Sequence, residues 1–189
     1  MKIRSTQITT LLILIALLFY SCRQTQRRDE FGNGKTQRIC DLKNGLRNGI
    51  CTSYFENGRI ESINRYVNDT LHGACKYFHR NGTLSWQVQF DRGQKNGVVH
   101  YYDSLGTRYQ TSTYLHGLLE GPSYSYYPSG IVKMKMTYHR NRREGYYVFF
   151  DETGKIKRKE TYSEGRRIDV TEYDSVGHKV MRPIESITA

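Results

Sequence analysis

Residues 121–145 read GPSYSYYPSGIVKMKMTYHRNRREG, and this stretch holds one complete structural unit. It begins and ends on glycine, and Gly130 follows a segment rich in tyrosine. Residues 132–138 then alternate strictly between apolar side chains and lysine or threonine. An alternation of period two with one polar face is typical of an antiparallel strand in a half-exposed sheet. Because glycine supplies the positive φ that a tight reversal needs, the stretch predicts a β-hairpin.

The same unit recurs along the chain with a fixed step of 24 residues. One glycine series falls at Gly49, Gly73, Gly97, Gly121 and Gly145, and a second at Gly58, Gly82, Gly106, Gly130 and Gly154. An aromatic residue keeps the same step at Tyr66, Phe90, Tyr114, Tyr138 and Tyr162. A fixed internal period indicates a repeat array, and a single hairpin is marginal in water, so the units must stack on one another.

The sequence therefore predicts an all-β protein, an elongated antiparallel meander of tandem 24-residue hairpins over residues 39–182. Short connections favour a meander because successive strands then pair with each other. A partial unit near residues 39–42 begins the array. At the other end the last hairpin is irregular, since Tyr173 keeps the register but Gly177 comes one residue early.

The pattern Gly-x-x-x-(x)-Tyr/Phe-x-x-x-Gly-x-Leu/Ile resembles the bacterial variant of the MORN repeat, which also occurs in proteins labelled YwqK-type antitoxins. The resemblance covers about residues 39–180, nearly all of the chain that follows the leader. It implies an elongated sheet of hairpins that binds a partner. It brings no catalytic residues to carry over, because the motif residues are structural.

The first residues read as a lipoprotein leader. Residues 1–21 combine Lys2, Arg4 and a short apolar run at 11–19, which is typical of a secretory signal peptide. The segment Leu18-Phe19-Tyr20-Ser21-Cys22 resembles a bacterial lipobox, with Phe19 where leucine is usual. The resemblance implies an acylated Cys22 that holds the protein on a membrane outside the cytoplasm, on the outer membrane or facing the periplasm. The alternative is an ordinary signal peptide and a plain thiol.

Polar segments are expected on both sides of the array. Residues 22–38 are mostly polar and are predicted to be a flexible tether, with Arg23, Arg27 and Arg28 beside the membrane. Residues 183–189 are predicted to be a tail.

Three cysteines follow Cys22. A turn near Leu46 would place Cys40 and Cys51 opposite each other on neighbouring antiparallel strands, where an oxidising compartment permits a disulfide. Cys75 shares the repeat position of Cys51, two strands away at about 9.6 Å, too far for a bridge. Three free buried thiols are the alternative. The cysteine and histidine spacings are not those of a zinc site, and no catalytic motif is found, so neither a metal, a cofactor nor an enzyme activity is expected.

Positive charge gathers in the last repeats. The chain has a formal charge of +11, and eleven Lys or Arg fall between residues 131 and 167 against five acids. A basic binding patch is expected from Lys133, Lys135, Arg140, Arg142, Arg143, Lys155, Lys157 and Lys159. A basic stripe among tyrosines can attract an acidic partner. The alternative is that these lysines keep a one-layer sheet soluble and discourage edge pairing.

Three roles agree with these features. The first is a non-catalytic cell-envelope lipoprotein whose repeats bind a protein or an envelope component. The second is an antitoxin or immunity protein that neutralises a toxin by binding it, which rests on the family resemblance alone. The third is direct docking on anionic membrane through the basic end. Nucleic acid is not expected as a partner, because the leader directs the chain out of the cytoplasm.

Overall fold

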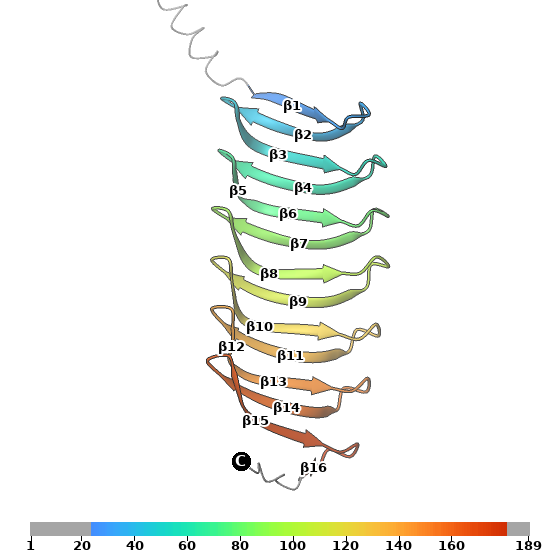
Figure 1. Ribbon diagram of the computed structural model, residues 1–189, viewed down its shortest axis with the longest axis vertical. Coiled ribbons are helices and arrows are strands. Elements are labelled where there is room, and N and C mark those ends of the chain that lie inside the picture. The colour runs from blue at the N-terminus through green and yellow to red at the C-terminus, as the bar shows by residue number, and fades with distance from the viewer. Residues whose placement is uncertain (1–23, 181–189) are drawn as a thin grey trace, which may run out of the picture.

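The computed structural model describes residues 24–180, which form one open antiparallel sheet of 16 strands. The strands follow one another in chain order from β1 at one end to β16 at the other (Figure 1), and residues 24–180 contain no helix. The expected all-β meander of tandem hairpins is confirmed. The first eight strands are β1 (Gln24–Glu30), β2 (Thr36–Lys43), β3 (Leu46–Tyr54), β4 (Ile60–Val67), β5 (Thr70–Leu71), β6 (Gly73–Phe78), β7 (Leu84–Asp91) and β8 (Gln94–Tyr102). The others are β9 (Arg108–Leu115), β10 (Leu118–Tyr126), β11 (Val132–His139), β12 (Arg142–Arg143), β13 (Gly145–Phe150), β14 (Ile156–Ser163), β15 (Arg166–Tyr173) and β16 (Lys179–Val180).

Two kinds of turn alternate along the sheet. One edge carries two-residue turns such as Asn44-Gly45, where both residues have positive φ (53° and 81°). This is the type I′ geometry, whose twist matches that of the flanking strands. The other edge carries longer turns such as the one closed by Gly58, whose N–H donates to the carbonyl of Phe55 at 2.8 Å. The 24-residue period is therefore one turn of each kind plus two strands.

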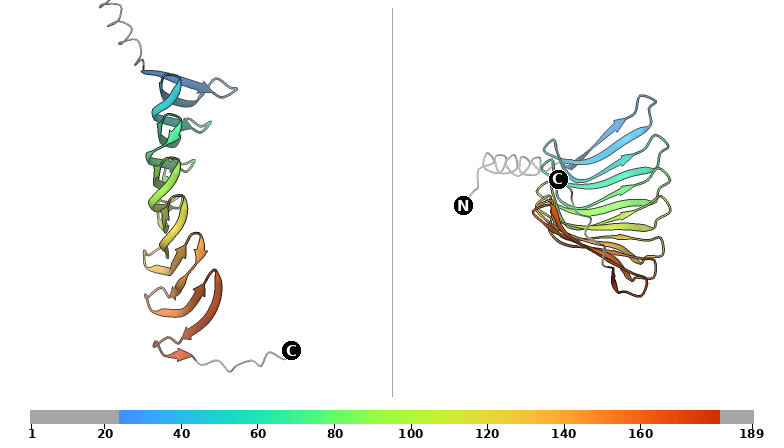
Figure 2. Two further views of the ribbon diagram at one scale, coloured as in Figure 1. Left: turned by 90° about the vertical axis from the view of Figure 1, so that its left-hand side faces the viewer. Right: turned by 60° about the horizontal axis from the view of Figure 1, so that its bottom comes forward.

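The first glycine series interrupts the strands. Gly73 begins β6 with a φ of 80° just after the short strand β5, and Gly145 begins β13 in the same way after β12. A residue in this conformation breaks the regular ladder and bends the strand. The strands are accordingly bowed, and the side view in Figure 2 shows one narrow layer that twists along its length.

One face of the sheet carries a row of buried side chains that crosses the array. Direct cross-strand partners such as Cys75 with Val88, and Ser112 with Ser123, belong to this row. The buried row consists of Cys40, Cys51, Asn64, Cys75, Val88, Val99, Ser112, Ser123, Met136, Tyr147 and Glu160, each at most 9% exposed. No second layer of described residues covers this face, so the burial comes from neighbouring side chains on the same bowed sheet.

A second row on that face, two residues along each strand, is rich in aromatics. Tyr77 stacks on Trp86 with ring centroids 3.8 Å apart, and Tyr101 on β8 is the direct cross-strand partner of Trp86. In order along the sheet, this aromatic row runs Ser53, Ser62, Tyr77, Trp86, Tyr101, Gln110, Ser125, Met134, Phe149, Arg158 and Glu172. We call the face with both rows the aromatic face and the other the opposite face. Aromatic pairs of this kind add about 0.5–1.5 kcal/mol beyond their buried area.

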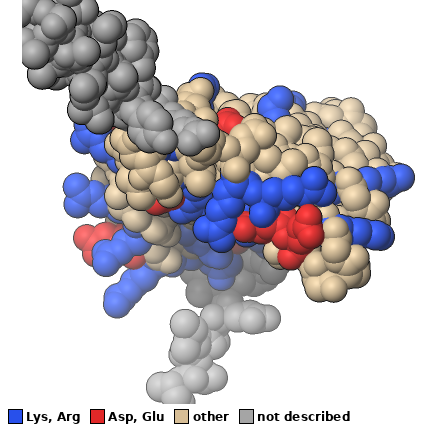
Figure 3. All heavy atoms as spheres, turned by 90° about the horizontal axis from the view of Figure 1, so that it is seen from above, with Lys and Arg blue, Asp and Glu red and all other residues tan. Residues whose placement is uncertain are grey.

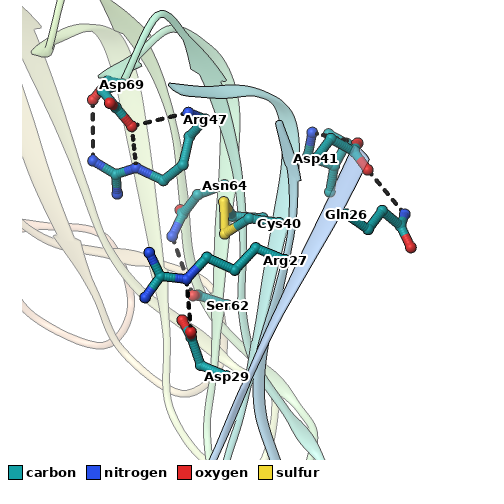
Figure 4. The surroundings of a disulfide bond; sticks show 11 residues. Gln26, Arg27, Asp29, Cys40, Asp41, Arg47, Ser62, Asn64 and Asp69 are labelled. Atoms are coloured by element: carbon teal, nitrogen blue, oxygen red, sulfur yellow. Dashed lines mark hydrogen bonds and ion pairs between the residues drawn. A yellow bond between two sulfur atoms is a disulfide. The ribbon is translucent and has the colours of Figure 1, made fainter. Parts of the chain in front are cut away.

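The N-terminal segment corrects one expectation. Residues 24–38 are not a flexible tether, because β1 pairs with β2 from Gln24↔Lys43 to Glu30↔Thr36 and the hairpin between them turns at Gly34. Side-chain contacts reinforce the pairing (Figure 4), including an amide donated by Gln26 to Asp41 at 3.0 Å. The array therefore begins at β1, fifteen residues before the expected boundary at residue 39.

The last repeat is one residue shorter than the 24-residue period. Glu172 pairs with Arg158 as Phe149 pairs with Met134, so Glu172 takes the place that Tyr173 would hold in an unbroken period. The position 24 residues after Gly145 is Asp169, and the register shifts just before it, between Arg167 and Asp169. The early Gly177 is thus explained by a residue lost within β15. The expected tail, residues 183–189, lies outside the described residues.

Candidate functional site

The cysteines occupy one end of the buried row. Cys40 and Cys51 are direct partners on β2 and β3 and are joined by a disulfide with an S–S distance of 2.04 Å (Figure 4). Cys75 is free and 1% exposed, and burial raises the pKa of its thiol. A thiol with a raised pKa and no solvent access is chemically inert. Cys22, the expected site of acylation, lies outside the described residues.

Residues 24–180 contain no group of His, Cys, Asp and Glu side chains arranged to hold a metal ion. Within the same range, no helix has the length and apolar character needed to cross a membrane.

The eight basic residues expected to form one patch are distributed over five places. Arg140 and Arg142 lie at the two-residue turn after β11, in a pocket with His139, Glu144 and Glu164. Acids neutralise part of this charge. Glu120 accepts the main-chain N–H of Arg140 at 2.9 Å, and this hydrogen bond, with one from the His139 ring, lowers the pKa of the Glu120 carboxyl.

Arg143 lies on the aromatic face. Its guanidinium is 5.2 Å from the ring centroid of Tyr162 and donates to the Tyr162 hydroxyl at 3.1 Å, which raises the pKa of Arg143. That hydroxyl donates in turn to Glu160 at 2.8 Å. Arg158 and Arg167 each approach the same carboxylate at 3.0 Å, and Glu160 is only 3% exposed. A buried carboxylate with this many donors fixes the side chains around it.

Lys135 and Lys159 lie on the opposite face. Each is a direct cross-strand partner of Val148 on β13, so the two lysines flank that strand. The Lys159 ammonium is 3.6 Å from the ring centroid of the exposed Tyr146. Lys155 is separate from them, in the turn before β14, where its ammonium donates to the carbonyl of Ser175 at 3.1 Å.

Lys133 and Lys157 share a pocket near the longer turns of the last repeats. The pocket has a volume of about 460 Å³, within the usual size of small-ligand sites. It is lined by Tyr127, Lys133, Phe149, Phe150, Lys157, Arg158, Glu172 and Tyr173, and we call it the terminal pocket. The Tyr127 hydroxyl donates to the carbonyl of Phe150 at 2.9 Å, which holds that ring in place.

The prediction that these residues form a single basic patch is therefore wrong. The prediction grouped them by their position in the chain, whereas the fold places them apart. Alternation, together with the bulge between β10 and β11 at Lys133 and the bulge between β13 and β14 at Lys157, sends nearby lysines to different faces. One signal for the terminal pocket was present in the sequence, since Lys133 and Lys157 are 24 residues apart and hold the same repeat position. The aromatic walls and Glu172 were not foreseen. Viewed from the β1 end, Lys and Arg are also spread widely over the surface, with acids beside them (Figure 3).

The comparison with protein families agrees with the hairpin period. Residues 47–68, 119–140 and 143–164 match the MORN repeat variant. They cover the hairpins β3–β4, β10–β11 and β13–β14, and their starts differ by multiples of the 24-residue step. No curated protein matches the chain. The intervening hairpins carry the same turns and pairings as the MORN-variant segments, so one repeat geometry extends through the sheet.

Proposed function

We propose that this protein is a non-catalytic cell-envelope lipoprotein whose MORN-variant sheet is a scaffold for binding a protein or an envelope component. One observation carries the proposal: residues 24–180 form a single layer, so both faces of a long sheet stay open to a partner. Repeat arrays use such extended surfaces for binding. The aromatic row supports the idea, because aromatic and Arg side chains are enriched where proteins bind partners.

The lipid anchor is supported by the leader and Cys22 in the sequence. Acyl chains each contribute about 0.8 kcal/mol per buried methylene, so several chains hold a protein stably on a bilayer. Substitution Cys22→Ala in the full chain should move the protein from the membrane to the soluble fraction and abolish incorporation of labelled fatty acid. A Cys75→Ala variant is the matched control and should stay with the membrane. Equal membrane retention of both variants would refute the anchor.

The binding role is tested by affinity capture of the full chain from detergent-solubilised membranes. A partner recovered in a constant ratio supports the scaffold, and recovery of lipid alone counts against it. The alternative role, an antitoxin or immunity protein, rests on the family resemblance. It would be supported if the captured partner were toxic when expressed alone and harmless when co-expressed with this chain.

A further inference from the structure

The terminal pocket has a composition that the repeat does not require. Lys133 and Lys157 hold a position that Glu61, Ser85 and Tyr109 hold in the earlier repeats. Those repeats form the same hairpins, so lysine at this position has no structural necessity. Two lysines in successive repeats nevertheless bring two exposed ammonium groups into one pocket.

The charge of the terminal pocket favours an anion. The lining carries three positive charges, on Lys133, Lys157 and Arg158, and one negative charge, on Glu172. Because Arg158 is also paired with Glu160 behind the lining, the two lysines supply the excess positive charge. The Arg158 guanidinium is held 3.0 Å from Glu160 and 4.4 Å from the ring centroid of Phe149, so its position is set by the sheet. An anionic group in this pocket would accept charge-assisted hydrogen bonds from these three cations, and the Arg158 guanidinium is already fixed in place.

The walls of the terminal pocket are aromatic rings. Tyr127, Phe149, Phe150 and Tyr173 are all partly exposed and line it together with the cations. The ammonium of Lys133 lies 5.6 Å from the centroid of the Tyr127 ring. A ring face suits a flat, apolar surface, while a cation beside it suits a charged substituent. A pyranose bearing a carboxylate combines both, because one side of the sugar ring presents C–H groups.

We propose that the terminal pocket binds an anionic glycan, with a uronic-acid type of sugar ring against the aromatic walls and its carboxylate at Lys133, Lys157 and Arg158. The inference rests on the proposed envelope scaffold, because export of the chain is what makes a surface polysaccharide, rather than a nucleic acid, the relevant anion. The glycan is thereby the envelope component that the scaffold holds, and the last two repeats are its binding site.

The test is calorimetric titration of the full chain in detergent with a tetramer of galacturonic acid. The neutral, carboxyl-reduced tetramer is the first comparison, and we expect it to bind at least roughly tenfold more weakly, as for the loss of a charge-assisted contact. Two further ligands of the same charge lack a pyranose ring: tetraglutamate contains no sugar, and a short oligonucleotide contains only furanose rings. Both are expected to bind more weakly than the uronate.

A pair of variants tests the location. The double substitution Lys133→Ser and Lys157→Ser installs the residue that the chain itself carries at position 85, and should weaken uronate binding at least roughly tenfold. Lys135→Ser with Lys159→Ser removes the same charge from the opposite face and should change binding less than roughly threefold. Circular dichroism checks that both variants keep the sheet.

Several results would overturn the inference. Equal losses in the two double variants would show a diffuse charge effect. Equal binding of tetraglutamate or the oligonucleotide would show that the pyranose ring is not recognised. Absence of uronate binding overturns it regardless of the variants. The scaffold proposal survives these results if membrane capture recovers a partner that the Lys133→Ser, Lys157→Ser variant still holds.

Discussion

Reducing the Cys40–Cys51 disulfide should loosen the N-terminal repeats and leave the C-terminal repeats unchanged. The bond closes a loop with a sequence separation of 11, for which the chain-entropy relation gives about 2.8 kcal/mol at 25 °C. Every 1.4 kcal/mol is a factor of ten, so the opening equilibrium of β2 and β3 should rise about 100-fold. In a repeat array each unit contacts only its neighbours, and the effect should fade along the sheet.

Amide hydrogen exchange of the full chain, with and without a reductant, measures this directly, because slow exchange reports local opening. Peptides from β2 and β3 should lose about two orders of magnitude of protection, while β13 and β14 should keep theirs. In a Cys40→Ala, Cys51→Ala variant the reductant should have no effect. Unchanged exchange in β2 and β3 after confirmed reduction would refute the view that this bond restrains the array. So would an equal loss of protection at both ends.

Three other substitutions test how the array is packed. Glu160→Gln should cost roughly 2–3 kcal/mol in urea unfolding, because it leaves the guanidinium groups around a buried carboxylate without their counter-charge. Burial alone would raise the pKa of Glu160, but the surrounding hydrogen bonds outweigh burial and lower that pKa. The stabilisation by the Glu160 carboxylate is therefore present at pH 7 and declines as pH falls below about 4.3. A pH-independent difference in stability between wild type and the Glu160→Gln variant would contradict this. Gly97→Ala, at φ 87° with open space around its Cβ, should cost about 1–2 kcal/mol. Gly49→Ala, at the same repeat position, should cost roughly 1–3 kcal/mol more in the same assay, because its Cβ would lie 2.8 Å from Asp41, and equal costs would refute that clash.

The 24-residue period predicted the fold because each repeated position has the same structural role in every hairpin. Glycines recur where the backbone needs positive φ, and Tyr138 and Tyr162 recur where rings pack on the aromatic face. Such tasks are set by residues close in the chain, so a sequence displays them. The antiparallel meander then follows from short connections.

The strand β1 was missed because composition reports burial, and an edge strand buries little. Its residues QTQRRDE are nearly all exposed, and backbone pairing with β2 holds them. The turn signal was nevertheless present. Gly34 lies 24 residues before Gly58, and Phe31 lies 24 residues before Phe55, with the same hydrogen bonds in both turns. Extending the glycine series by one more step predicts this hairpin despite its polar strands.

The sequence predicts only part of the terminal pocket, because the pocket depends on the pairing register of the strands as well as on the 24-residue period. The step of 24 residues relates Lys133 to Lys157, but the bulge between β13 and β14 decides that Lys157 and Arg158 both reach the pocket. The loss of one residue in β15 then places Glu172 beside Arg158. Neither event leaves a pattern that repeats.

This contrast indicates where specificity can arise in a protein built from identical hairpins. A position that must be glycine or aromatic in every repeat cannot distinguish one partner from another, because changing it costs stability. The position shared by Lys133 and Lys157 is different, since glutamate, serine and tyrosine hold it elsewhere in the same sheet. Among its neighbours in the terminal pocket, Phe150 holds a position that is aromatic in every full repeat, whereas Asp103 and Ser125 hold the positions of Tyr127 and Phe149 elsewhere. Specificity therefore arises where variable positions place charge and further rings beside a ring that the fold already holds, and the last two repeats are where this chain does so.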